Sequence, residues 1–163
     1  METVGVAAEW KDLFVAAAGA SAALAGLVFV AVSINLDRIL ALEGVTNLAL
    51  STLALLIGVL ITSMFGLIPG QETGTLGVEL LVWAVLLTAF VAFQGIRSAS
   101  VSDHAGYASR LIVPAFGTVP VLIGAVLLTG GEASGLDWVF AGMVGAIIAA
   151  VMNAWILLVE ILR

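Results

Sequence analysis

The 163-residue sequence contains no cysteine, and only five of its residues are lysine or arginine. The absence of cysteine excludes disulfide bonds, thiolate metal sites and cysteine nucleophiles. Charged residues make up 10% of the chain, far below the roughly 25% of a typical soluble domain. The formal charge of −6 gives no indication of nucleic-acid binding. The composition therefore argues against an ordinary soluble domain and does not suggest nucleic-acid binding.

The sequence also lacks the common motifs of catalytic and metal sites. It contains no nucleophile elbow, Walker loop, HExxH motif or pair of acids within an apolar stretch. The single histidine stands in the pair Asp103-His104, which has no further metal ligand nearby, so a solvated loop is the favoured interpretation. We therefore predict no enzymatic activity, no metal site and no cofactor.

What the sequence does contain is apolar residues, at 63% of the chain, gathered in five long stretches between short polar segments. A helix needs about 20 apolar residues to cross a bilayer, and the stretches lack the alternation of barrel strands. We predict one all-α integral membrane domain over residues 1–163, a polytopic bundle of five transmembrane helices. The expected spans are 13–36, 48–68, 78–96, 111–128 and 138–162. The first is too long for a signal-peptide core and follows no basic segment, so we expect it to be retained.

The positive residues indicate the orientation of the chain. Arg38, Arg97, Arg110 and Arg163 fall on alternate connections and at the C-terminus, whereas the opposite face carries only Lys11. Because cationic loops stay in the cytoplasm, we expect the N-terminus outside and the C-terminus inside a bacterial inner membrane.

This orientation depends on the fourth stretch, which contains Pro114, Gly117 and Pro120. Each proline deletes a backbone hydrogen bond, which membrane helices tolerate when neighbours or water satisfy the freed carbonyls. We expect a helix break here, most simply a kink. A discontinuous helix whose carbonyls line a site is the alternative, and a re-entrant segment would move the C-terminus outside.

Small residues recur at intervals of three or four in the first and last spans, so that two helix backbones could approach closely. Such stripes are usually packing seams, and in a minority of proteins they line a narrow pore in an oligomer. The first set is Ala18, Ala22 and Gly26, and the second is Gly142, Ala146 and Ala149, followed on the same face by Asn153 and Glu160.

A second candidate is the polar cluster that ends the first span. Ser33 and Asp37 are four residues apart and should share a helical face, beside Asn35 and Arg38. We interpret the cluster as a helix end anchored at the cytoplasmic surface, with a pore mouth as the functional alternative.

Other polar residues within the spans are few. Ser51 and Thr62, like Thr52 and Ser63, are eleven residues apart and form two lines of hydroxyls, while Gln94 follows Leu87 at helical spacing. Asn153 lies at mid-depth in the last span, where an amide is expected to form an interhelical hydrogen bond. No ionisable residue is expected near the bilayer centre, which argues against a proton-coupled carrier or a charge-lined ion path.

The segment 14–40 (FVAAAGASAALAGLVFVAVSINLDRIL), with the later Ile68-Pro69-Gly70-Gln71 and the segment 76–80 (LGVEL), resembles a family of small, uncharacterised bacterial multi-pass membrane proteins common in actinobacteria. Some of its members are labelled "modulator of FtsH protease". The resemblance implies an inner-membrane location and assigns no functional residues.

Two hypotheses about function remain. The first is an accessory or structural membrane protein that self-associates or binds other membrane proteins through helix–helix contacts within the lipid bilayer. The second is a homo-oligomeric ion channel or small-solute pore, with the first or the last span around its axis.

Overall fold

The computed structural model describes residues 6–42, 44–99 and 104–162. In this part of the chain every element is helical, as predicted. The elements are η1 (Val6–Trp10), α1 (Lys11–Ile34), α2 (Leu36–Ala41), α3 (Val45–Gly66), α4 (Thr73–Ala99), α5 (His104–Thr129) and α6 (Gly135–Leu162).

Five of the helices, α1, α3, α4, α5 and α6, are long and apolar enough to cross a membrane, which confirms the predicted all-α bundle. Their apolar segments match the predicted spans closely, although α4 and α5 extend several residues beyond them. At about 1.5 Å per residue, each helix is long enough to cross some 30 Å of hydrocarbon.

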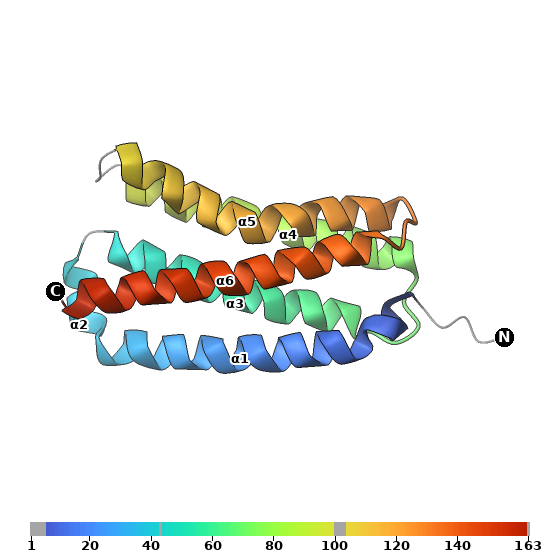
Figure 1. Cartoon of the computed structure of the whole chain (residues 1–163), viewed down its shortest axis with the longest axis horizontal. Coiled ribbons are helices and arrows are strands. Elements are labelled where there is room, and N and C mark those ends of the chain that lie inside the picture. Colours follow the sequence, from blue (N-terminus) through green and yellow to red (C-terminus); the bar gives the residue numbers. More distant parts are fainter. Residues whose placement is uncertain (1–5, 43, 100–103, 163) are drawn as a thin grey trace.

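The helices are arranged as a ring of four with the fifth outside it. Helices α3, α4, α5 and α6 form this four-helix ring, in which α5 contacts both α4 and α6 extensively, and α3 closes the circle. Helix α1 packs mainly on α3 and barely touches α6. Figure 1 shows the long helices side by side. We refer to the end that carries α2 as the α2 end, and to the other, which carries the 130–134 turn, as the Gly131 end.

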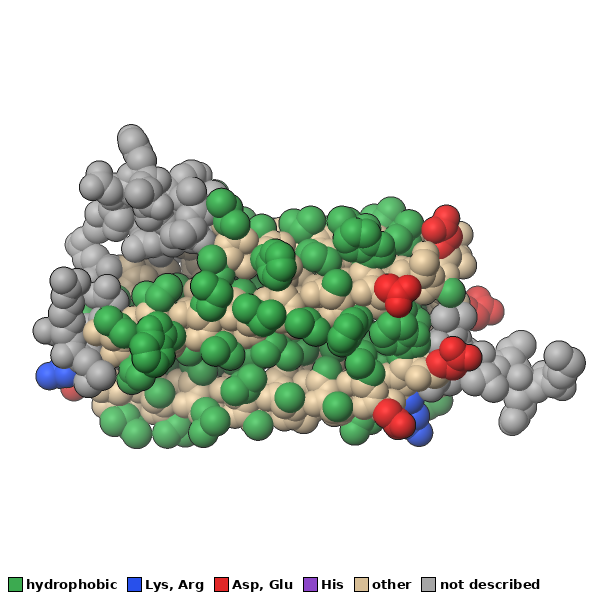
Figure 2. Space-filling model, in the orientation of Figure 1, with side chains coloured by type: hydrophobic (Ala, Val, Ile, Leu, Met, Phe, Trp, Pro, Cys, Tyr) green, Lys and Arg blue, Asp and Glu red, His purple; other side chains and the backbone are tan. Residues whose placement is uncertain are grey.

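The exterior of the bundle is a hydrophobic band with charged side chains at its two ends (Figure 2). Large apolar residues such as Phe29, Leu86 and Ile148 are exposed along the middle of the helices. Acidic residues gather at the Gly131 end, where Glu9, Glu132 and others are exposed. This distribution suits a protein surrounded by hydrocarbon along its length and by water at its ends.

Helix α5 continues as a helix through both prolines, so the alternative of a discontinuous helix is not observed. It runs alongside α4 and α6 from the α2 end to the Gly131 end (Figure 1). The Thr118 hydroxyl donates to the carbonyl of Pro114 over 3.3 Å, inside the proline-containing segment. The carbonyl of Phe116, which loses its helical donor at Pro120, lies against Gly145. Close packing against α6 thus stabilises a helical segment that the two prolines weaken. The re-entrant alternative is not observed.

The end of the first span is less continuous than predicted. Instead of one helix reaching Leu36, α1 ends at Ile34, and α2 begins at Leu36. The interruption is at Asn35 (φ −108°, ψ 20°), whose side-chain amide donates to the carbonyl of Ala31 over 2.9 Å. Asparagine commonly satisfies backbone groups in this way outside regular helix, which explains the break.

Glycine allows the turns that follow α2 and α5. Gly44 (φ 83°) precedes α3, and Gly131 (φ 85°) lies between α5 and α6. Other residues adopt such positive φ angles only at a cost. The second turn is short, so α5 and α6 pack as an antiparallel pair.

Candidate functional site

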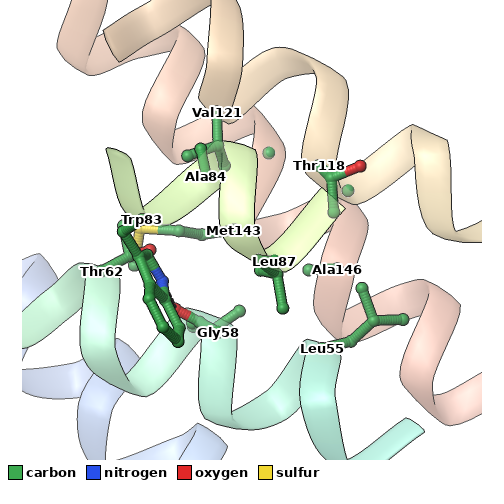
Figure 3. A pocket seen from close by; sticks show the side chains of 13 residues that line it. Leu55, Gly58, Thr62, Trp83, Ala84, Leu87, Thr118, Val121, Met143 and Ala146 are labelled. Atoms are coloured by element: carbon green, nitrogen blue, oxygen red, sulfur yellow. Dashed lines mark hydrogen bonds between the residues drawn. The ribbon is translucent and has the colours of Figure 1, made fainter. Parts of the chain in front are cut away.

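The interior of the four-helix ring contains a small apolar cavity (Figure 3). Its volume is about 10 Å³, close to the space that one water molecule needs. Among the residues around it, Thr62 and Thr118 carry hydroxyls and Trp83 carries an indole N–H, which donates weakly to the carbonyl of Gly58 over 3.4 Å.

The small residues predicted on the last span pack against α5. A Cβ atom placed on Gly117 would lie 2.6 Å from the Ala146 Cα, and one on Gly142 would lie 2.8 Å from the Gly117 carbonyl oxygen. Gly142, Ala146 and Ala149 are all buried. The stripe on α6 is therefore a packing seam within the chain. Glu160 lies in α6, but its side chain is outside the described residues.

The corresponding stripe on α1 has no partner in the described chain. Ala22 and Gly26 are exposed and Ala18 is half-buried. A Cβ added to Gly19 or to Gly26 would meet no atom within 4 Å. The same pattern of small residues thus lies inside the fold on α6 and on its surface on α1.

Helix α1 packs against the core through several partly buried apolar side chains and one large, fully buried side chain near the Gly131 end. Phe14 is 1% exposed, and its aromatic carbons occupy the space that a Cβ on Gly66 would fill. The only other buried residue of α1 is Ser21, whose hydroxyl donates to the carbonyl of Ala18 in its own helix. The contact between Phe14 and Gly66 could not be predicted from the sequence, since glycine is common throughout the spans.

The polar cluster at the end of the first span does not form one helical face. Ser33 belongs to α1, whereas Asp37 and Arg38 belong to α2. All three are exposed and Asn35 is half-buried. Helix α2 is fixed by Ile39, which is 1% exposed and packs with residues of α3 and α6. The cluster is therefore a capped helix end at the surface of one chain.

Several hydroxyl groups of the spans donate to carbonyls of their own helices. Thr52 donates to the carbonyl of Leu48 over 2.7 Å, and Ser63 to that of Val59 over 2.8 Å. Thr88, Thr118 and Thr129 each donate to the carbonyl four residues before them. The two predicted lines of hydroxyls on α3 are buried, but the bonds of Thr52 and Ser63 do not join α3 to another helix.

Two further features of the structure could not be predicted from the sequence. A groove of about 460 Å³ lies between α3 and α4, lined by apolar residues that include Ile57, Trp83 and Phe90. At the Gly131 end, the side-chain amide of Gln71 donates to Glu79. The Gln71 side-chain oxygen is, within the described ranges, a buried polar atom without a hydrogen-bond partner. No sequence signal reveals either feature, because both depend on how the 67–72 turn and the α3–α4 pair fold.

The described residues contain no group of three or more histidine, cysteine, aspartate or glutamate side chains that could hold a metal ion. Asp103 lies outside the described residues, and so does the side chain of His104. Comparisons with protein-family models, with curated proteins and with solved structures gave no match. The family resemblance of segment 14–40 remains a prediction.

Proposed function

We propose that this protein is an accessory membrane protein that acts through helix–helix contacts, with α1 as its docking helix and a second copy of the chain as the first partner. The observation that supports the proposal is the position of α1. It packs mainly on α3, buries only Phe14 and Ser21, and leaves Gly19, Ala22 and Gly26 exposed.

A close helix partner would fit this surface for a physical reason. Lipid chains are as apolar as leucine, so helices associate in a membrane by close packing rather than by the hydrophobic effect. Gly19, Ala22 and Gly26 turn to one side of the contact with α3, where another helix could approach the α1 backbone. The α6 seam is already filled by α5, so α1 is the favoured site of association.

The channel hypothesis is less favoured within one chain. The interior of the four-helix ring narrows to a cavity of about 10 Å³ with a largely apolar lining. A conducting path would have to form between copies of the chain, along exposed faces such as that of α1. Ion flux in liposomes distinguishes the two: an accessory protein leaves the flux at the level of empty vesicles, and a measurable conductance would favour the pore.

Single cysteines test the docking face, because the natural chain has none. Ala22→Cys should form disulfide-linked dimers in membranes under mild oxidation. Ala20→Cys is the matched control, since Ala20 is also exposed, lies two residues away and projects from the other side of α1. Equal cross-linking at the two positions, or none at either, would refute this docking face.

A second pair of variants measures the energy of association. Gly26→Leu should weaken dimerisation by about 1–3 kcal/mol, the usual cost of overpacking, which is about 5- to 150-fold in the dissociation constant. The monomer should remain stable, because a Cβ on Gly26 meets nothing within the chain. Ala20→Leu should leave dimerisation unchanged.

We further propose a bacterial inner membrane as the location, with the N-terminus outside and the C-terminus in the cytoplasm. The proposal rests on the cationic connections of the sequence, and the exposed acidic side chains at the Gly131 end are compatible with it. The α2 end would then face the cytoplasm.

A further inference from the structure

The groove of about 460 Å³ between α3 and α4 opens on the outer surface of the bundle. Each helix contributes residues at helical spacing, which are Leu50, Leu53, Ala54 and Ile57 from α3 and Trp83, Leu86, Leu87 and Phe90 from α4. Four of the large side chains, Leu50, Ile57, Leu86 and Phe90, are between 43% and 59% exposed and form the walls. Half-buried residues, among them Ala54, Trp83 and Leu87, form the floor.

The groove is hollow because two large side chains of α4 are drawn toward the interior. A Cβ atom on Gly58 would lie 2.5 Å from Leu87 Cδ2, so Leu87 occupies the space that this glycine leaves. The Trp83 indole N–H donates to the Gly58 carbonyl over 3.4 Å. Both side chains also line the central cavity, and Figure 3 shows them close to Gly58. They therefore separate the cavity from the groove and leave the outer side, over Ala54, unfilled.

The dimensions of the groove suit hydrocarbon chains better than a helix. Its lining residues extend over seven positions of each helix, or about 10 Å. Spread over this length, the volume gives a mean cross-section of roughly 45 Å², whereas a helix 10–12 Å across needs about 80–110 Å². A lipid chain gains little from leaving equally apolar lipid for an apolar groove. Any preference for one lipid must therefore come from its headgroup.

The charge at the α2 end of α4 indicates which headgroup this is. The groove lies nearer that end, because Leu50 is five residues from the start of α3. In α4, Arg97 follows Phe90 by seven residues, which places it on the same helical face and about 10 Å nearer the α2 end. In α3 the half-buried Asn47 precedes Ala54 by seven residues. Neither α3 nor the part of α4 beyond the groove contains an acidic residue, so this end complements an anionic headgroup.

We propose that the α3–α4 groove binds an acyl chain of an anionic phospholipid, whose headgroup lies at the α2 end beside Arg97 and Asn47. Arginine is the residue best suited to pair with a phosphate, and an amide N–H adds a further donor. A zwitterionic headgroup brings its own cation to the same place, so it is bound less well. This proposal rests on the membrane location of α3 and α4 and is independent of docking through α1.

The fluorescence of Trp83 tests the proposal, because bromine atoms on a lipid chain quench a tryptophan that they touch. The chain has four tryptophans, and the test protein carries phenylalanine in place of Trp10, Trp138 and Trp155. In bilayers of brominated phosphatidylglycerol or phosphatidylcholine, the quenching of Trp83 should show a preference of about fivefold for phosphatidylglycerol, the effect of one arginine near the surface. A companion protein with Trp155 alone, which is 67% exposed on α6, should show almost no preference.

Two substitutions separate the groove from the general charge of the α2 end. Arg97→Gln should abolish the preference at Trp83. Arg38→Gln is the matched control, since it removes the same charge at the same end from α2, whose Ile39 packs with Leu157 of α6. It should leave the preference unchanged. The unsubstituted protein gives a measurement that does not depend on variants, because native mass spectrometry from mixed nanodiscs should show one retained phosphatidylglycerol.

Filling the groove tests the position of the chain itself. Ala54→Phe should reduce quenching of Trp83 by both lipids, whereas Ala20→Phe, on the exposed surface of α1, should not. Equal preferences at Trp83 and Trp155, or an equal loss in Arg38→Gln and Arg97→Gln, would overturn the proposal. Absence of quenching at Trp83 by either lipid would also overturn it, because another protein surface would then cover the groove. None of these outcomes depends on dimerisation through α1.

Discussion

The contact between α5 and α6 predicts a large effect for the smallest change, Gly117→Ala. The added Cβ would lie 2.6 Å from the Cα, 2.7 Å from the backbone nitrogen and 2.8 Å from the Cβ of Ala146. Carbon atoms in contact normally lie about 3.5–4.0 Å apart, so α5 and α6 must separate by roughly 1 Å. Backbone atoms cannot rotate away, which places the cost at the upper end of the usual 1–3 kcal/mol for overpacking.

The separation would also loosen the neighbouring contacts of the same seam. Gly145 lies against the Phe116 carbonyl, and Gly124 against the Gly135 carbonyl, where added Cβ atoms would lie 2.6 and 2.5 Å from the oxygens. We therefore expect Gly117→Ala to lower the free energy of unfolding by about 3 kcal/mol. Reversible unfolding in mixed micelles, followed by circular dichroism, measures this quantity.

Gly19→Ala is the matched control, because Gly19 is also within a membrane-spanning helix but has no atom within 4 Å of the added Cβ. It should be neutral or stabilising by up to about 1 kcal/mol, from the better helix propensity of alanine. In the double variant Gly117→Ala, Ala146→Gly, only one of the three close atoms is removed, so recovery should be partial. Equal stabilities of Gly117→Ala and Gly19→Ala, or full recovery in the double variant, would refute this account of the seam.

Two further predictions concern the attachment of α1 and the topology. Phe14→Ala should cost about 3–5 kcal/mol at the α1–α3 contact and raise hydrogen exchange in α1 before the four-helix ring, whereas Phe29→Ala, at a residue 62% exposed, should change little. Uniform loss of protection in all helices would contradict a peripheral α1. Cysteines introduced at Ala41 and Ser134, both exposed and at opposite ends of the bundle, should be labelled from opposite sides of the membrane, with Ser134→Cys reacting from outside the cell. Labelling of both from one side, or of Ser134→Cys from the cytoplasm, would overturn the proposed orientation.

The sequence was sufficient for the fold class and the five spans, because hydrocarbon imposes length and composition on every helix that crosses it. It was insufficient for the order in which the helices pack. The stripes that contain Ala22 in α1 and Ala146 in α6 look alike in sequence, yet one is exposed and the other is buried. Small residues show only that a close approach is possible, and the neighbouring helix decides whether it occurs.

The candidate site illustrates the same limit at the level of single residues. Asn153 and Gln94 are recognisable in sequence as polar residues in apolar spans. Which residues of the neighbouring helices they face could not be predicted, because the register between helices is set by packing. The break at Asn35 was missed for a related reason. A polar residue near a helix end is compatible both with a continuous helix and with a capped interruption.

Because hydroxyl side chains bond within their own helices, they affect which substitutions this bundle should tolerate. Thr52, Ser63 and Thr129 bond to carbonyls of their own helices, and the Trp83–Gly58 bond is the hydrogen bond described between two long helices. Shape rather than polar pairing therefore specifies which helix lies beside which. In a saturation mutagenesis experiment, replacing these hydroxyl residues by alanine should often be silent, while enlarging a glycine of the α5–α6 seam should not. The glycines of this seam fix the axial register of α5 relative to α6, two helices whose surfaces are otherwise apolar.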